Sequence, residues 1–431
     1  MALKTKWLLS KIKSPSCPMV GVYRALAFCP GCCVIFHGPL GCAYVGQTMD
    51  LGSGFRVIAD NGADSLTPAP LVSSNLREKD GIFGGIGRLE DCISYVVETY
   101  TPRCIFVVTS CVAGVIGDDV EEAAKEAEVR HGIPVIAMPF AGFLGGEYGD
   151  GYYETANLVI SRFFEKREKV PGRVLLLGDQ MGPEGQYGAE VRRLLSLFGL
   201  SAAYQFPGYV PAAEWGDISS CEFSVVLGAA DRSAGLLKLA KRLEDEYGIR
   251  TLGDVYPVGF SETKRWMAEL AKMLGVPEKG AEMIASETKR IEAAAAAFLP
   301  VTRGKKLVIG TGRSTKWYNP AETLASVSAL QMNVSGIVFY GNLTEAEKAE
   351  IREKCAAFPE VPFYEADAGK EIMDEADVLL TTNEIFETPA KQLFIPMVPQ
   401  AGTEGEILFL RAIYRLLCRY GKKGGVAYVT V

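Results

Sequence analysis

Histidine is nearly absent from this chain, since only His37 and His131 occur among its 431 residues. Imidazole is the usual general base near neutral pH and a frequent metal ligand, so chemistry that depends on it has little to draw on. A thiol chemistry is better supplied, because the chain contains 11 cysteines. Thiolates are therefore the first candidates for a functional site.

An excess of positive charge is also missing. The chain has 45 Lys and Arg against 52 Asp and Glu, a net charge of -7, so we expect no nucleic-acid partner. The longest apolar stretch, Cys104 to Gly117, is broken by polar residues and glycines and falls short of the roughly 20 residues that span a bilayer. The start, Met1 to Lys13, is basic with only a short apolar patch, unlike a signal peptide. We expect a cytoplasmic protein without membrane contact.

The cysteines are concentrated toward the start of the chain. Without an export signal, they are expected to be thiols or metal ligands rather than disulfides. They fall into an N-terminal group, a second group and three scattered residues: Cys17, Cys29, Cys32, Cys33 and Cys42; Cys92, Cys104 and Cys111; Cys221, Cys355 and Cys418.

Apolar runs rich in β-branched residues alternate with amphipathic segments along most of the sequence. Cys104 to Thr109 is a predicted buried strand, Asp118 to Arg130 a predicted helix, and Ile133 to Met138 the next strand. Alternation at this spacing predicts parallel sheets covered on both faces. The expected fold is α/β, with three consecutive Rossmann-like, doubly wound parallel-sheet domains.

Two segments rich in Pro and Gly mark the predicted domain boundaries, Val170 to Gly172 and Pro300 to Gly304. The predicted domains are therefore an N-terminal α/β domain with the cluster cysteines, a middle α/β domain and a C-terminal α/β domain, at residues 1–170, 171–302 and 303–431.

Ligands of such sheets bind where strands end and loops converge. Cys111 follows the strand predicted at Cys104 to Thr109, and Asp118 or Asp119 is suited to cap the next helix. A free cysteine is more often a small buried apolar residue than a ligand. Cys111 alone therefore does not define a site.

The N-terminal cysteines strengthen the indication of a metal or redox site. Cys17 and Cys42 lie in predicted loops with Pro and Gly, where soft thiolates can hold an iron–sulfur cluster. Cys29-Pro-Gly-Cys32 alone could be a thioredoxin-type dithiol or half of a zinc site. A redox dithiol usually lies between a strand and the start of a helix, and Cys29 is not placed there. A zinc site would need a second pair of ligands, and no clear second pair is present. Spacing alone leaves these alternatives open.

Three segments resemble the component 1 subunits of nitrogenases and nitrogenase-like reductases in order and spacing. They are Cys17-Pro-Met-Val-Gly followed by His37-Gly-Pro-Leu-Gly-Cys42, Leu76-Arg-Glu-Lys-Asp80-Gly-Ile-Phe-Gly-Gly85, and Thr109-Ser-Cys111-Val-Ala-Gly-Val-Ile-Gly-Asp-Asp119. Agreement is weaker beyond the N-terminal third, and the last third matches mainly in its alternation of strands and helices.

The resemblance implies that Cys17, Cys42 and Cys111 are the three cysteines that each subunit contributes to an electron-relay cluster, 4Fe-4S or 8Fe-7S. Three thiolates cannot complete a four-iron cube, and an eight-iron cluster takes about six. A second chain, either a copy or a homologous subunit, would therefore complete the site. The resemblance also implies an ATP-dependent 4Fe-4S reductase homodimer as electron donor.

The chain departs from the family in the ligands of the molybdenum–iron cofactor. No cysteine occurs in the corresponding middle segment, Leu227 to Ser233, and no histidine follows His131. Cys221, just before a predicted strand, is expected in the core. We therefore expect no molybdenum cofactor ligated by this chain.

Several nearby residues carry open assignments. His37 could donate a hydrogen bond to cluster sulfur or serve a structural role. Cys29, Cys32 and Cys33 exceed the three expected ligands, and one of them could touch the metal. Glu78, Lys79 and Asp80 are expected to form a solvated charged turn.

The leading hypothesis is a subunit of a nitrogenase-like oxidoreductase, an enzyme component that relays electrons to a substrate or second cofactor; catalytic residues and substrate are not identified. The alternative is a scaffold protein for assembly of a nitrogenase-type metal cofactor. A third hypothesis is an α/β protein with a zinc or dithiol site and no redox cluster.

Overall fold

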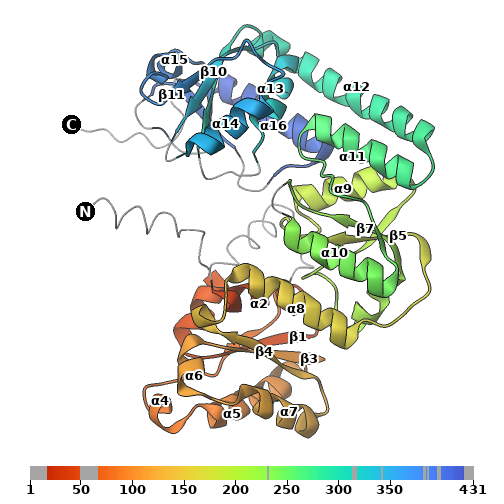
Figure 1. Cartoon of the computed structure of the whole chain (residues 1–431), viewed down its shortest axis with the longest axis vertical. Helices are drawn as coiled ribbons and strands as arrows, with labels where there is room; N and C mark the ends of the chain where they lie inside the picture. The colour runs from red at the N-terminus through yellow and green to blue at the C-terminus, as the bar shows by residue number, and fades with distance from the viewer. Residues whose placement is uncertain are drawn as a thin grey trace. The chain divides into compact units, whose positions relative to one another are not determined.

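The computed structural model describes residues 17–48, 67–230, 233–312, 318–340, 343–381, 385, 388–395 and 399–421 (Figure 1). The basic start, Met1 to Lys13, lies outside these residues. The chain forms two compact units. The first comprises the described parts of 1–185, 201–227 and 234–251, and the second those of 186–200, 228–233 and 252–431.

The N-terminal sheet of the first unit is parallel, with strand order β2-β1-β3-β4. Its strands are β1 (Cys32–His37), β2 (Leu71–Ser73), β3 (Cys104–Thr109) and β4 (Val135–Ala141). β1 and β3 are buried throughout and pair from Cys32 opposite Cys104 to His37 opposite Thr109. Continuous burial is typical of parallel strands that are covered on both faces.

Helices cover both faces of this sheet (Figure 1). α5 (Ile86–Tyr100) and α7 (Val120–His131) pack on one face through buried apolar residues at helical spacing. α2 (Pro18–Leu26) contacts β1 and β3 on the other face and packs along α8 (Tyr148–Phe163).

The contact between α2 and α8 is made at two glycines. A Cβ atom on Gly21 would lie 2.0 Å from the carbonyl oxygen of Tyr148, and one on Gly151 would lie 2.0 Å from the carbonyl oxygen of Pro18. Only glycine allows the two backbones to approach so closely. This crossing therefore fixes the position of α2, which begins directly after Cys17.

The first unit contains a second parallel sheet, with order β6-β5-β7-β8. Its strands are β5 (Val170–Leu177), β6 (Ser201–Phe206), β7 (Cys221–Val226) and β8 (Arg250–Thr251). α10 (Ala234–Tyr247) packs against β7 and β8. Cys221 is fully buried at the start of β7, so the expectation that it lies in the core is confirmed.

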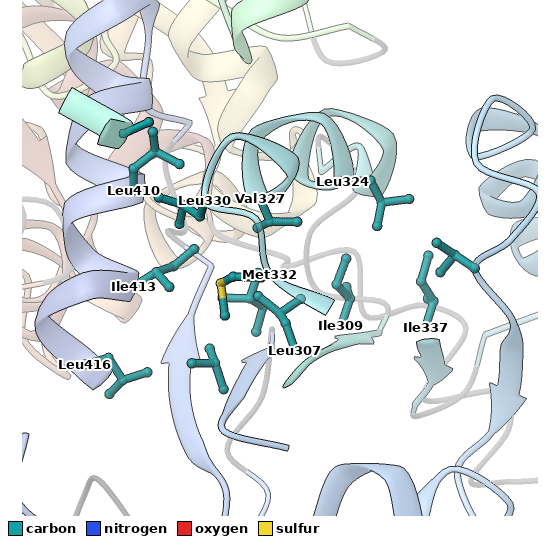
Figure 2. Packing of buried hydrophobic residues seen from close by; sticks show 14 of the residues in the cluster. Leu307, Ile309, Leu324, Val327, Leu330, Met332, Ile337, Leu410, Ile413 and Leu416 are labelled. Carbon is teal, nitrogen blue, oxygen red and sulfur yellow. The ribbon is translucent and has the colours of Figure 1, made fainter. Parts of the chain in front are cut away.

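The second unit is built on a five-stranded parallel sheet, with order β11-β10-β9-β12-β13. Its strands are β9 (Lys306–Thr311), β10 (Asn333–Phe339), β11 (Phe363–Glu365), β12 (Val378–Thr381) and β13 (Lys391–Phe394). Its helices are α9 (Gln186–Leu197), α11 (Phe260–Met273), α12 (Pro277–Thr302), α13 (Pro320–Ala329), α14 (Glu345–Lys354), α15 (Lys370–Asp374) and α16 (Gly402–Cys418). Leu307 and Ile309 of β9 pack beside Leu324 and Val327 of α13 and Ile413 of α16 (Figure 2).

The predicted fold class is confirmed, because the chain is α/β with three parallel sheets. The strand predicted at Cys104 to Thr109 is β3, and the helix predicted at Asp118 to Arg130 is α7. The division into domains at 170/171 and 302/303 stays a prediction. No helix among the described residues is both long and apolar enough to cross a membrane.

Candidate functional site

Cys17 lies at the N-terminus of α2. It is the N-cap residue, and Pro18 occupies the first helical position, where its missing N–H costs no hydrogen bond. The backbone carbonyl of Cys17 accepts a hydrogen bond from the amide of Val20 at 3.1 Å. The thiol therefore belongs to the start of a short rigid helix rather than to a free loop.

Cys42 lies four residues after Gly38, just beyond the carboxyl end of β1. Residues 40–48 are helical, so the sequence-based expectation of a loop at Cys42 is wrong. The helix starts directly after Pro39, which lies at the N-cap position just before the first turn. A loop was predicted here because Gly and Pro are common loop residues.

Cys111 follows β3 and is the first residue of α6 (Cys111–Ile116). Ser110 caps this helix, because its hydroxyl accepts a hydrogen bond from the amide of Ala113 at 3.2 Å. The strand end and the cap together fix the backbone at Cys111. Its place at the carboxyl end of a parallel strand is where ligands of such sheets bind.

The structure brings these three thiols together. Burial raises the pKa of Cys17, and the nearby thiols of Cys42 and Cys111 add to this rise. Burial and the Cys111 thiol also raise the pKa of Cys42. Among the 11 cysteines these three alone are half-buried; Cys418 is exposed and the others are buried. Three thiols thus meet where a second surface can reach them.

The donor set fits an iron–sulfur cluster better than a single ion. Within the described residues no group of three or more His, Cys, Asp or Glu side chains could hold one metal ion. A cluster of several irons has ligands spread around it, and cysteine thiolates are its usual ligands. Thiols that interact without converging on one point are compatible with such a cluster.

His37 has a structural role: its side chain links neighbouring segments of the site and does not serve as a ligand. The residue is fully buried; its Nδ1 lies 2.9 Å from the Ser74 hydroxyl and its Nε2 lies 2.9 Å from Asp118 Oδ2. Burial lowers its pKa, opposed by Asp118. Since both ring nitrogens are engaged, His37 has none left for cluster sulfur.

Of the two aspartates predicted as alternative caps of the next helix, Asp118 is instead a positioning residue. It accepts a hydrogen bond from the amide of Gly85 at 2.9 Å in addition to its contact with His37. The capping of α7 falls to Asp119, which accepts from the amide of Glu122. The sequence contains one indication of this role. Two adjacent aspartates precede α7, and because one helix needs only one cap, the other aspartate is available for a different contact.

The expectation of a solvated turn at Glu78, Lys79 and Asp80 is wrong for Asp80. Its carboxylate is buried, accepts a hydrogen bond from the amide of Arg77 at 2.7 Å and pairs with Arg88 at 2.6 Å. The Arg77 amide, followed by Arg88, lowers the pKa of Asp80. Asp80 thereby anchors the start of α4 (Asp80–Phe83) and α5.

Exposed apolar side chains surround the site. They lie on the helix at residues 40–48, on α4, on α6 and on η1 (Gly142–Leu144), and are between 40% and 86% exposed. We call them the apolar rim: Leu40, Tyr44, Val45, Ile82, Phe83, Val112, Val115, Phe143 and Leu144. α6 contacts both α4 and η1, so much of the rim is continuous. A patch of this kind marks an interaction surface.

The remaining N-terminal cysteines lie at the opposite end of the strands, where β1 begins. Cys32 and Cys33 begin β1, whereas Cys42 follows its carboxyl end. A strand rises about 3.3 Å per residue, so the two ends of β1 are well over 10 Å apart. Cys29, Cys32 and Cys33 are also buried. The hypothesis that one of them touches the metal at the Cys42 site is therefore not supported.

Comparison with known proteins agrees with this geometry. The family described as nitrogenase component 1 type oxidoreductase matches residues 17–407. A nitrogenase iron-molybdenum cofactor biosynthesis protein NifE of Clostridium pasteurianum is 30% identical over 65% of this chain and 59% of its own length. The NifE protein of Nostoc sp. is 25% identical over 89% of this chain and 79% of its own length.

A nitrogenase molybdenum-iron protein alpha chain of Methanosarcina barkeri is 25% identical over 67% of this chain and 54% of that protein. This chain therefore spans between about half and four fifths of these relatives. Among solved structures, one described as nitrogenase Cp1 at pH 5 superposes with a TM-score of 0.63. It covers 94% of this chain and 88% of that one at 18% identity, which supports the fold alone.

Proposed function

This chain belongs to the nitrogenase component 1 family of oxidoreductases, and within that family we propose that it is an iron–sulfur subunit of a scaffold on which a nitrogenase-type metal cofactor is assembled. The observation that carries the proposal is the meeting of Cys17, Cys42 and Cys111 at one half-buried surface. A cluster held there would supply electron transfer. The chain's own residues supply the thiolates and fix their backbone positions through helix starts at all three cysteines.

The three-cysteine count requires a second chain. Three thiolates leave part of the cluster without ligands, whichever of the two cluster types is bound. The apolar rim lies beside Cys42 and Cys111 and supports a partner that covers it. That partner is a copy of this chain or a homologous subunit. The electron donor proposed from the family is an ATP-dependent 4Fe-4S reductase homodimer.

The proposal of a scaffold rests on two further points. Both NifE relatives described above, one of which matches 89% of this chain, are named as cofactor biosynthesis proteins. The chain also lacks the cysteine and histidine with which catalytic subunits of the family keep their cofactor, since Leu227 to Ser233 contains no cysteine and no histidine follows His131. Weak anchoring suits a protein that must release its product. Strong permanent anchoring would oppose that release.

A reductase is the second candidate, and it was the leading hypothesis from the sequence. The observation that favours it is the similarity to nitrogenase molybdenum-iron protein alpha chains. Such a subunit would use the same cysteines and the same partner surface. The two functions differ in what leaves the protein: a completed cofactor, or a reduced small substrate.

One experiment separates the two. The chain, purified without oxygen together with its partner, is given iron, sulfide, molybdate, an extract that supplies the remaining cofactor precursors, and the ATP-dependent reductase. A scaffold should then restore activity to a cofactor-deficient nitrogenase molybdenum–iron protein, and Cys42→Ala should not. Cys92→Ala is the control, because Cys92 is buried within α5. Catalytic turnover of a small substrate without transfer of a cofactor would contradict the scaffold proposal and favour the reductase.

A further inference from the structure

Three cysteines that the proposed function does not use form a second thiol group. Cys32 Sγ and Cys104 Sγ lie 3.6 Å apart, and Cys29 is close enough to Cys32 for their thiols to interact. All three side chains are at most 2% exposed. They lie at the amino-terminal edge of the N-terminal sheet, away from Cys42 and Cys111.

A tight turn holds Cys29 beside Cys32. The amide of Cys32 donates to the carbonyl of Cys29 at 3.1 Å, with Pro30 at the second position and Gly31 at the third with φ of +90°. Proline followed by a residue of positive φ is the signature of a type II turn. The Cα atoms of the first and fourth residues are then less than about 7 Å apart, close to the distance that a disulfide spans.

Strand pairing holds Cys32 beside Cys104. The two residues are direct partners in the parallel pair of β1 and β3. Neighbouring strands are about 4.8 Å apart, within the roughly 4.4–6.8 Å between the Cα atoms of a disulfide. The sulfur atoms must approach from 3.6 Å to about 2.05 Å for a bond to form. Rotation of the two side chains and a small strand adjustment can supply that movement.

Cys33 shows that position rather than burial defines the group. It is 1% exposed, adjacent to Cys32 in sequence, and packs with α5 and α7 in the core of the other face. Successive side chains of a strand point to opposite faces. Cys33 is therefore separated from the pair by the sheet itself and provides a matched control.

We propose that Cys29, Cys32 and Cys104 form a redox-active three-thiol site, in which oxidation by a peroxide closes a Cys32–Cys104 disulfide that Cys29 can exchange. The site is distinct from the proposed cluster site and does not depend on it. The closed form links β1 to β3 at the amino-terminal edge of the sheet. Cys32 is the shared member, because it is the one thiol placed beside both others.

The chemistry balances with hydrogen peroxide as oxidant. One thiol attacks the O–O bond, giving a sulfenic acid and water, and the second thiol displaces the sulfenic hydroxyl as a second water molecule. Two thiols are oxidised by two electrons and one peroxide becomes two waters. Exchange follows when the Cys29 thiol attacks Cys32 sulfur and frees Cys104, with no net oxidation.

Burial sets which oxidant can act and how fast. Burial, with the neighbouring Cys104 and Cys29 thiols, raises the pKa of Cys32, so its reactive thiolate is scarce and reaction is slow. Pro30 and Gly31, which connect Cys29 to Cys32, are exposed, so solvent reaches the turn that carries two of the thiols. Because the thiols themselves are buried, a small uncharged peroxide can reach them far more readily than a peptide disulfide such as oxidised glutathione.

The test uses the full chain, isolated in reducing buffer, treated with excess hydrogen peroxide, alkylated and cleaved with chymotrypsin. Cleavage after Phe28 and Phe36 releases the peptide Cys29 to Phe36 without Cys42, and cleavage after Tyr100 and Phe106 releases the peptide Thr101 to Phe106 without Cys111. Mass spectrometry should find these two peptides joined, together with a fraction of the first peptide that carries an internal Cys29–Cys32 disulfide from exchange, and reduction should remove both species. The number of free thiols in these two peptides, counted after denaturation because the three cysteines are buried, should fall by two on oxidation.

Variants assign the sulfur atoms. Cys32→Ser should abolish the joined species, whereas Cys33→Ser should retain it, and Cys29→Ser should retain it without exchange. Circular dichroism checks that each variant is folded, and Cys33→Ser matches Cys32→Ser in burial. Absence of the joined peptides from the oxidised wild-type chain, their persistence in Cys32→Ser, or their loss in folded Cys33→Ser would each overturn the proposal.

Discussion

Replacing Gly151 with alanine tests how the structure positions Cys17. Alanine inside a helix is normally favourable over glycine by about 1 kcal/mol. Here the added Cβ would lie 2.0 Å from the carbonyl oxygen of Pro18. Cβ atoms in proteins essentially never approach another heavy atom more closely than 3.0 Å. The obstacle is backbone, so no side chain can rotate away. α2 must move by ~1 Å, the difference between these two distances.

The expected effects follow from that displacement. Overpacking of this kind costs about 3 kcal/mol at the upper end of its range, so the net loss of unfolding free energy should be about 2 kcal/mol. Metal sites tolerate errors of about 0.5 Å, so a shift of Cys17 by twice that amount should reduce bound iron. Denaturant unfolding and iron per chain are the two assays.

Gly149 is the matched control in the same helix. A Cβ there meets only the ring of Tyr153, at 3.9 Å, which is ordinary contact. Gly149→Ala should leave iron content unchanged and stability equal or slightly higher. If Gly151→Ala were as stable as Gly149→Ala and bound as much iron, the helix crossing would not position Cys17 and the reasoning would be refuted.

Three further predictions concern the partner surface, the second unit and the metal. Phe83→Asp should weaken association by about 2 kcal/mol, roughly 30-fold in Kd, and should lower the native mass. Val129→Asp, at a residue that is equally exposed at 86%, should change neither. Equal native masses for the two variants would contradict the assignment of the apolar rim as the partner surface. Burial, aided by Glu322, raises the pKa of Glu406 from 4.5 to about 7. Between these two pKa values the unfolded chain binds fewer protons than the folded chain, so the free energy of unfolding should fall by about 3 kcal/mol as the pH rises from 4.5 to about 7. Glu406→Gln should remove this loss. Parallel plots of unfolding free energy against pH for the variant and the wild type would contradict the prediction. Elemental analysis of the iron-loaded chain should find no stoichiometric molybdenum, whose presence on this chain alone would reveal an unrecognised anchor.

The sequence predicted the fold class well because parallel strands buried on both faces carry an unmistakable pattern. Cys104 to Thr109 has apolar side chains on both faces, and it is β3 with the predicted bounds. Such a run fits few other environments in an α/β protein. Helix limits were less accurate, since α7 begins at Val120 rather than Asp118. Local propensity cannot show that Asp118 is engaged by His37 instead of the helix.

Local patterns also failed where tertiary contacts decide the outcome. Asp80 reads as part of a charged turn, yet its burial depends on Arg88 and the Arg77 amide around it. Cys29 and Cys32 read as a dithiol without context, and the third thiol, Cys104, is distant in sequence and reaches them only through the pairing of β1 with β3. Long-range pairing of this kind has no signature in local composition.

The central claim is that Cys17, Cys42 and Cys111 hold an iron–sulfur cluster at a subunit interface. Its most direct test is iron content and the electron paramagnetic resonance spectrum of Cys42→Ala, purified without oxygen beside the wild type and Cys92→Ala. We expect the wild type and Cys92→Ala to share one cluster signal, and Cys42→Ala to lose or convert it because a missing thiolate exposes iron. An unchanged signal and iron count in Cys42→Ala would contradict the assignment.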